Sequence, residues 1–294
     1  MKRGPRMVIW FVCILAATYL VVGVWVYANQ RRLVFVPSHH EVTTPETVGL
    51  TYENVTLSVG ANEQIHGWYF PVENASQTVL FCHGNAGNIS SRLPTAQLLT
   101  SLGVNVLLFD YRGYGRSTGT PSEQNCYEDA LAAWQWLTEH KQLPPDAIII
   151  FGRSLGGAVA VETATRVPCG GLIVESSFTS IAAMGRRMFA IFPTDWLVRY
   201  RFASIEKIGR VSCPVLITHS RDDTLIPFEM GRELFAAAAA PKGFLAFSGD
   251  HNDREYLNDP RYRQALAAFL TNPEIVKRSD NDGNFQPSKD IDKQ

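Results

Sequence analysis

Two stretches of this sequence place a serine in a G-x-S-x-G pattern: GRSTG around Ser117 and GRSLG around Ser154. The pattern is typical of a nucleophilic serine on a sharp turn between a buried strand and a helix. The apolar run AIIIF precedes the second match, and the helical stretch LGGAVAVETATR follows Ser154. Ser117 instead lies in a glycine- and proline-rich segment with no helix before Pro121. We therefore predict that Ser154 is the nucleophile and that Ser117 belongs to a surface loop.

A serine hydroxyl is a weak nucleophile at neutral pH and needs a histidine base that a carboxylate orients. In a strand-turn-helix architecture these partners follow later strands, in the order serine, acid, histidine. His251, in GDHND, follows a late strand and is the predicted base. Asp223, in DDTLIP, is the predicted acid, with Asp222 and Glu175 as alternatives. We expect His219, at the end of the preceding strand, to make a structural hydrogen bond.

Acyl transfer also requires backbone N–H groups that bind the oxyanion of the tetrahedral intermediate. The glycine-rich loop FCHGNAGN comes directly after an apolar strand, and the residue after the nucleophile supplies a second donor. We assign these roles to the amides of Asn85 and Leu155. Such chemistry requires no metal or organic cofactor. The five cysteines are scattered without a C-x-x-C spacing and indicate neither a disulfide framework nor a zinc site.

The elements that must position these residues follow an alternating pattern. Residues 51–59 and 64–72 predict an opening antiparallel pair, because β-type residues alternate within segments that turn residues bound. Short apolar runs then alternate with helical stretches, which is typical of a parallel sheet covered by helices on both faces. The runs are TVLFC, NVLLFDY, AIIIFG, GLIVES, PVLITHS and GFLAFSG, and the helical stretches are 92–102, 127–140, 155–166, 228–239 and 261–271. We predict one α/β domain over residues 31–271.

The N-terminus has a different composition. Residues 7–28 carry no charge over about the length needed to cross a bilayer, so we predict a membrane anchor in residues 1–30. A cleaved signal peptide ending at VYA is the alternative. Three basic residues precede the span and two follow it (Lys2, Arg3, Arg6, Arg31 and Arg32), which favours a single-pass anchor with the domain on the non-cytoplasmic side.

Two segments fall outside the alternation. Residues 176–212 form a long insertion rich in aromatic residues and methionines, which predicts either a small cap over the site or a helix pair packed on the sheet. Residues 272–294 are polar and show no periodicity, so we expect a disordered tail.

Six motifs resemble the α/β-hydrolase superfamily in order and spacing: HGNAGN, FDYRGYGRSTGTPSE, GRSLGG, ESSFTSI, DDTLIP and GDHND. Within it the chain is similar to the membrane-anchored α/β-hydrolase-domain serine hydrolases, to which Bem-type proteins belong. The similarity spans roughly residues 33–270 and includes the position of the anchor. It implies Ser154, Asp223 and His251 as a catalytic triad, and it identifies the segment around Ser117 as a loop of the family. Members act as esterases, thioesterases or depalmitoylases.

These observations predict a serine hydrolase that cleaves an ester or thioester bond of a small or lipid-like acyl substrate, or of an acylated protein. A serine peptidase and a non-catalytic binding module of the same fold are the alternatives. A formal net charge of -1, without a basic cluster interleaved with aromatic residues, argues against a nucleic-acid partner.

Overall fold

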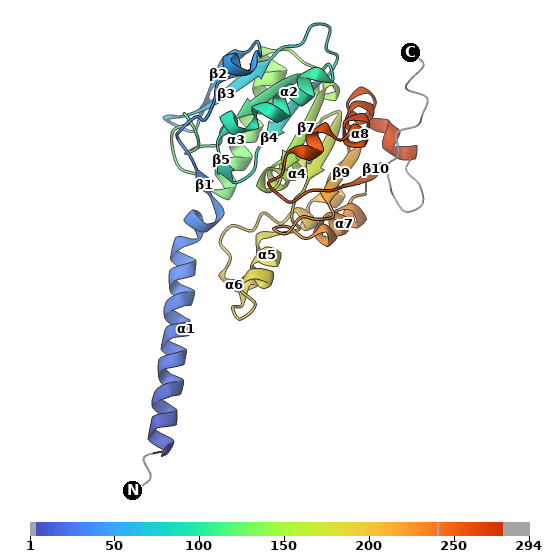
Figure 1. Cartoon of the computed structure of the whole chain (residues 1–294). Helices are drawn as coiled ribbons and strands as arrows, with labels where there is room; N and C mark the ends of the chain where they lie inside the picture. Colours follow the sequence, from blue (N-terminus) through green and yellow to red (C-terminus); the bar gives the residue numbers. More distant parts are fainter. Residues whose placement is uncertain (1–3, 240, 279–294) are drawn as a thin grey trace.

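The computed structural model describes residues 4–239 and 241–278. A long helix, α1 (Gly4–Val34), projects from an α/β domain (Figure 1). Within the described residues one segment, Met7–Val34, is long and apolar enough to cross a membrane, with a mean hydropathy of 2.5, and its most apolar stretch is not buried in the protein. The helix therefore runs a few residues past the predicted end of the anchor.

An eight-stranded sheet forms the centre of the domain, in the order β10-β9-β8-β7-β4-β6-β3-β2. Strands β4, β6, β7, β8, β9 and β10 are parallel, whereas β2 pairs antiparallel with β3, and β3 pairs antiparallel with β6. The bounds are Glu53–Val59, Glu63–Phe70, Thr78–Cys82, Asn105–Phe109, Ile148–Arg153, Gly171–Glu175, Val215–Ser220 and Lys242–Phe247 for β2, β3, β4, β6, β7, β8, β9 and β10. The predicted mostly parallel sheet and its opening antiparallel pair are confirmed.

Helices cover both faces of the sheet. Ile148 and Ile150 of β7 pack into the core beneath α3 and α4, whereas Ile149 and Phe151 pack with the apolar side chains of α2 and α8. A strand buried on both faces needs a continuous apolar run, which is the pattern that the sequence shows. The helices are α2 (Leu93–Ser101), α3 (Glu123–Gln135, continuing as a π-helical turn to His140), α4 (Leu155–Arg166), α7 (Phe228–Ala237) and α8 (Pro260–Thr271). Helix α3 begins four residues before the predicted start because the Ser122 side chain caps it.

Residues 176–212, called the cap below, combine both structures that the sequence left open. Helices α5 (Ile181–Met188) and α6 (Thr194–Leu197) stand away from the sheet and beside α1 (Figure 1). The second half instead packs into the core through the buried side chains of Phe202 and Ile208. Only the first half of the insertion is therefore a lid.

Helix α1 joins the domain without a linker. Strand β1 (Val36–Pro37) follows α1 almost at once and pairs with β5 (Ala86–Gly87), in the loop after β4. At the other end of the chain, Pro273–Arg278 form a 3-10 helix, and Val276 is buried in the core. The domain therefore extends past the expected boundary at residue 271, and residues 279–294 of the predicted tail lie outside the described residues.

Candidate active site

Ser154 occupies the sharp turn between β7 and α4. Its backbone is in a strained conformation with φ of 56° and ψ of −122°. The turn leaves little room, since a Cβ on Gly156 would lie 2.0 Å from the carbonyl oxygen of Cys82. The Ser154 N–H donates to Glu175 O at 2.9 Å, and the Ser154 carbonyl accepts from Ser177 Oγ at 2.8 Å. These bonds hold the strained turn in place from both sides.

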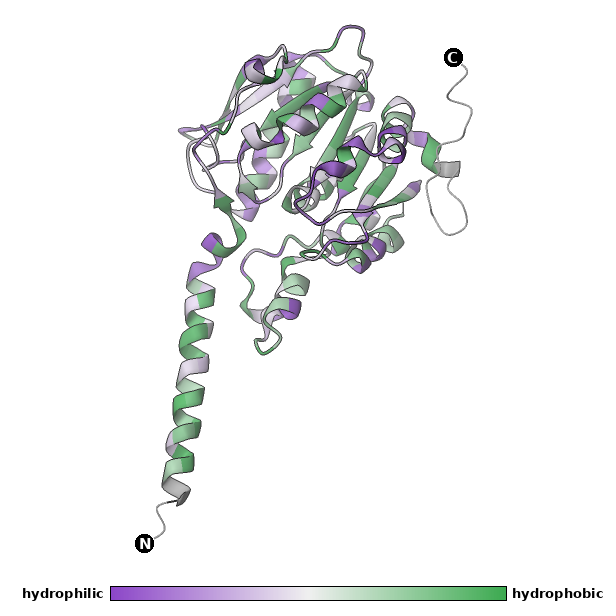
Figure 2. Cartoon of the chain, viewed as in Figure 1, coloured by the Kyte–Doolittle hydropathy of each residue, from purple (hydrophilic) through white to green (hydrophobic). Residues whose placement is uncertain are grey.

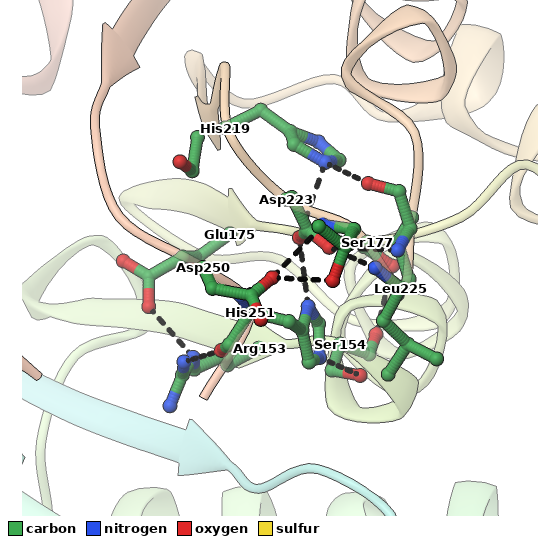
Figure 3. Close-up of polar contacts among 12 residues, drawn as sticks. Arg153, Ser154, Glu175, Ser177, His219, Asp223, Leu225, Asp250 and His251 are labelled. Atoms are coloured by element: carbon green, nitrogen blue, oxygen red, sulfur yellow. Dashed lines mark hydrogen bonds and ion pairs between the residues drawn. The ribbon is translucent and has the colours of Figure 1, made fainter. Parts of the chain in front are cut away.

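The predicted base and acid converge on this serine from two later strands (Figure 3). His251 follows β10, and its Nε2 lies 3.1 Å from Ser154 Oγ. Asp223 follows β9, and its Oδ2 lies 2.7 Å from His251 Nδ1. Neighbouring parallel strands end at the same edge of the sheet, which brings together residues that are 97 and 28 positions apart in the chain. All three side chains are largely buried.

The surroundings of Asp223 favour its charged form. Burial alone would raise the pKa of this carboxyl, but nearby His219, the hydrogen bond from His251 and the N–H of Ile226 outweigh that effect and lower it below its usual range. A carboxylate accepts the Nδ1 proton of His251, so that Nε2 is left free to accept the proton of Ser154. Asp223 can therefore set the tautomer of the histidine.

The alternatives for the acid occupy other positions. The Glu175 carboxylate, at the end of β8, accepts hydrogen bonds from the hydroxyls of Tyr256 and Tyr262. Asp222 accepts the N–H of Gly249 at 3.2 Å. His219 makes the expected structural contact, with Nε2 2.9 Å from the carbonyl oxygen of Ile226. Of the acidic candidates weighed from the sequence, Asp223 is the one hydrogen-bonded to the His251 ring.

One residue of this site was not anticipated from the sequence. Arg153, directly before Ser154, donates from Nη2 to His251 O at 2.5 Å (Figure 3). Its Nε lies 3.2 Å from Glu175 Oε1, and its Cζ lies over the ring of Tyr256, 5.7 Å from the centroid. The arginine at the second position of GRSLG was the available signal, but nothing in the sequence pairs it with the histidine loop.

The predicted oxyanion donors lie beside the serine. Leu155 is the first residue of α4, where backbone N–H groups have no partner within the helix. Asn85 lies in the loop after β4, and its carbonyl accepts from the Val36 N–H at 3.0 Å and from the Tyr114 hydroxyl at 2.8 Å. Asn85, Leu155 and Ser154 all line one cavity. The partial positive charge at the start of a helix also favours an oxyanion there.

Ser117 lies in a surface loop, as predicted, between the exposed Arg116 and Thr118, but its own side chain faces inward. Its side chain is buried; Oγ donates to Asp110 O at 2.8 Å and accepts the His66 N–H at 2.9 Å. The glycine before Arg116, Gly115, has φ of +52°, and a Cβ there would lie 2.0 Å from Asp110 Oδ2. The first G-x-S-x-G match thus serves a structural turn.

An apolar cavity of about 270 Å³ lies over Ser154. Its walls come from α1, from α5 and α6 of the cap, and from the loop after β9. The lining residues are Val26, Gln30, Leu33, Val34, Asn85, Ser154, Leu155, Phe178, Ile181, Met184, Gly185, Met188, Phe189, Phe192, Thr194, Leu197, Val198, Leu225 and Ile226. No ionisable acid or base is among them. Elsewhere in the described part of the chain, no three His, Cys, Asp or Glu side chains group closely enough to hold a metal ion.

Comparisons with known proteins find a family, related sequences and a shared fold. A family model described as serine aminopeptidase, S33, matches residues 73–204. The chain is 37% identical over 279 residues to the uncharacterized protein Rv2307c of Mycobacterium tuberculosis, covering 94% of this chain and 99% of that one. It is 30% identical over 327 residues to the lysophosphatidylserine lipase ABHD12 of Danio rerio, covering 93% and 85%. A structure of the Pyrococcus furiosus esterase Pf2001 shares the fold, with a TM-score of 0.69 at 21% identity over 81% of this chain and 96% of that one.

Proposed function

Because the chain belongs to the α/β-hydrolase family, we propose that it is a membrane-anchored serine hydrolase that cleaves an ester or thioester bond through Ser154, His251 and Asp223. The observation that carries the proposal is the continuous chain of contacts from Ser154 Oγ to His251 Nε2 at 3.1 Å and from His251 Nδ1 to Asp223 Oδ2 at 2.7 Å. This series of contacts ends at Ser154, on the floor of an apolar cavity. Such an arrangement activates a hydroxyl for attack on a carbonyl.

In the proposed mechanism, His251 Nε2 takes the proton of Ser154 as Oγ attacks the carbonyl carbon. The amides of Asn85 and Leu155 donate hydrogen bonds to the oxyanion that forms. His251 then gives its proton to the departing alcohol or thiol, which leaves an acyl group on Ser154. Water, deprotonated by the same histidine, attacks this acyl-enzyme and releases the acid. Asp223 remains a carboxylate and holds the imidazole ring throughout.

The cavity supports an acyl substrate. Its walls are almost wholly apolar, so burial of an alkyl chain is favourable at about 25 cal/mol per Å² of apolar surface. The similarity to a lysophosphatidylserine lipase points in the same direction. We propose a lipid-like acyl ester, or an acylated protein whose acyl chain enters the cavity, as the substrate.

The description of the matching family model raises aminopeptidase activity as a second candidate. An aminopeptidase must bind the charged α-amino group of its peptide, which an unpaired carboxylate does well and an apolar wall does not. No acidic residue of the described chain is among the residues that line the cavity. The lining therefore favours an acyl ester over a peptide.

The orientation of the anchor is part of the proposal. The charges that flank the span favour a cytoplasmic N-terminus, and the α/β domain would then lie on the non-cytoplasmic side. An uncleaved anchor is supported by Gln30 and Leu33, which line the cavity and would be separated from the helix by cleavage after residue 28. Protease protection in sealed, inverted membrane vesicles tests the orientation. The cytoplasmic face is outside in such vesicles, so an added protease would digest a cytoplasmic domain and leave a non-cytoplasmic one intact.

Labelling with a fluorophosphonate probe tests the activated serine directly. The purified full-length chain should label, Ser117→Ala should label if it stays folded, and Ser154→Ala should not label. Circular dichroism must show that both variants retain the fold. A folded wild-type chain that does not label, or a Ser154→Ala variant that does, would overturn the proposal in favour of a non-catalytic module of the same fold.

A further inference from the structure

The cap and the anchor meet along the wall of the cavity, and this contact carries a proposal about how substrate enters. We propose that residues 188–197, called the cap edge, are embedded in the bilayer leaflet next to the domain, and that the cavity takes one acyl chain laterally from that leaflet. The identity of the reaction rests on the proposed function. The position of the cap edge does not.

Contacts between α1 and the cap fix the depth of the cap edge. The Tyr19 hydroxyl donates to Ile191 O at 2.9 Å, and the rings of Tyr19 and Phe192 stack with their centroids 4.8 Å apart. Gln30 Nε2 donates to Leu197 O at 2.6 Å. The cap edge therefore runs alongside α1 from Gln30 down to Tyr19.

This descent is about as long as one leaflet is deep. Tyr19 precedes Arg31 by 12 residues, which is about 18 Å along a helix at 1.5 Å per residue. The hydrocarbon core of a bilayer is about 30 Å thick, and charged residues that flank a span stay near its surface. With Arg31 in the headgroup region, outside the hydrocarbon, Tyr19 and the Phe192 ring stacked on it lie within the hydrocarbon of the leaflet next to the domain.

The side chains of the cap edge suit this environment. Met188, Phe189, Ile191 and Trp196 are exposed, Trp196 to 91%. Figure 2 shows apolar colouring along most of α1 and on the loop between α5 and α6. An exposed apolar patch of this kind indicates a protein or membrane contact, and tryptophan is enriched at membrane interfaces.

The charged residues at this edge are compatible with a membrane surface. Arg186 forms an ion pair with Asp195, so that neither charge is left alone. Arg187 is exposed on the same helix, and a long arginine side chain can extend its charge to the interface. Trp196 and Leu197 lie level with Gln30, near the flanking arginines of α1.

The cavity connects the cap edge to Ser154. Val26 and Leu33 of α1 form one wall, Met184 and Met188 of α5 form another, and Ser154 lies at the base. A cavity of about 270 Å³ with apolar walls has room for an alkyl chain. The substrate class that fits is an amphiphile from which a single acyl chain enters.

Fluorescence quenching tests the depth of the cap edge without any catalytic readout. In a background carrying Cys13→Ala and Cys169→Ala, the variant Ile191→Cys is labelled with a nitrobenzoxadiazole fluorophore and reconstituted into phosphatidylcholine vesicles. Arg261→Cys, at the exposed start of α8, is the matched control. A phosphatidylcholine with a nitroxide on its acyl chain should quench the label at 191 strongly and the label at 261 hardly at all. Equal quenching at both positions would overturn the embedding of the cap edge.

A pair of α1 variants tests whether the α1 side of the cavity contacts the acyl chain. Val26 lines the cavity, whereas Val24 is 67% exposed on another face of the same helix. Val26→Trp should lower the ratio of kcat/KM for p-nitrophenyl dodecanoate to that for p-nitrophenyl acetate by about tenfold, because the bulky ring fills the space for the chain. Val24→Trp should leave that ratio unchanged. A ratio that does not differ between the two variants would overturn the claim that the acyl chain binds against α1.

The two tests separate this inference from the proposed function. If wild type hydrolyses neither ester and Ser154 does not label, the proposed function fails, yet the quenching experiment still reports the depth of the cap edge. If both esters are hydrolysed but the label at 191 stays in water, the hydrolase stands and lateral entry falls.

Discussion

The Oδ1 atom of Asp223 accepts the N–H of Ile226 at 2.7 Å, so that its other oxygen, Oδ2, is directed at His251. The same Oδ1 also accepts the N–H of Leu225 at 3.0 Å. Two backbone N–H groups of the turn after β9 thus hold Oδ1, and Oδ2 is left to contact the histidine. Because the two oxygens have different partners, a substitution at Asp223 can affect catalysis and the stability of the fold separately.

Asp223→Asn should lower kcat by about 10⁴-fold, because an amide nitrogen at the Oδ2 position donates to His251 Nδ1 and stabilises the wrong tautomer. The stability of the fold should change little, since the amide oxygen can still accept from Ile226. Steady-state hydrolysis of p-nitrophenyl acetate checks this, with Asp222→Asn as the matched control that retains the wild-type rate. Similar losses in both variants would contradict the assignment.

Arg153 positions the loop that carries His251. Replacing it with methionine removes the bond to His251 O and should lower kcat by about 10²-fold with a smaller change in KM, since a displaced base acts on the chemical step. Rates of fluorophosphonate labelling should fall in parallel. If Arg153→Met unfolds the chain, Arg153→Lys provides the second reading, and a folded variant with wild-type kcat would refute the positioning role.

A buried carboxyl away from the site makes stability depend on pH. Burial raises the pKa of Asp110 to about 8, whereas the same group ionises near pH ~3.9 in an unfolded chain. The folded state then binds the extra proton between these values, so its stability declines as the pH rises from about 4 to about 8.

Asp110→Asn removes this titration and keeps an acceptor for the Ile89 N–H. The difference in melting temperature between variant and wild type should therefore shift in favour of the variant from pH 5 to pH 8, by about 3 °C or more in detergent solution. Differential scanning fluorimetry at a series of pH values measures it. A difference that stays constant with pH would show that Asp110 is ionised in the fold.

Two thiols lie close enough to be joined. The Sγ atoms of Cys169 and Cys213 are 3.2 Å apart, at the starts of neighbouring strands β8 and β9, and a disulfide bond is about 2.05 Å long. Oxidation would close a loop of 44 residues that contains the whole cap, with a stabilisation of about 4 kcal/mol in the chain-entropy treatment. Treatment with copper phenanthroline should yield the linked peptides by mass spectrometry and raise the melting temperature. Cys169→Ser should abolish both effects, and a wild-type chain that remains unlinked would contradict the prediction.

The parallel part of the fold could be predicted because each strand is an uninterrupted apolar run. The predicted bounds of α4 agree with the structure, since its strand and its turn are both marked by glycines. Strands β1 and β5 could not be predicted, because two residues carry no periodicity. The continuation of the domain to Arg278 was missed for a related reason: Ile275 and Val276 are isolated apolar residues in a polar segment.

The three candidate catalytic residues could be selected because their order along the chain is imposed by the sheet. The bond from Arg153 to the histidine loop and the contact of the cap with α1 could not, since they join segments far apart in the sequence. Ser117 shows the limit of a local pattern. Its loop was predicted, yet its burial arises from bonds to His66 and Asp110 on other elements.

The absence of a linker between α1 and the domain has a kinetic meaning. The Asn85 side chain donates a hydrogen bond to Val34 O at 3.2 Å, and the Val36 N–H donates one to Asn85 O. These bonds join the end of α1 to the loop that holds a predicted oxyanion donor. An enzyme held in this way cannot sweep out a volume above its membrane as a tethered one would. For the membrane hydrolase proposed above, encounters with a lipid-like substrate take place in two dimensions, and the quantity that sets turnover is the mole fraction of substrate in the lipid rather than its concentration in the surrounding water.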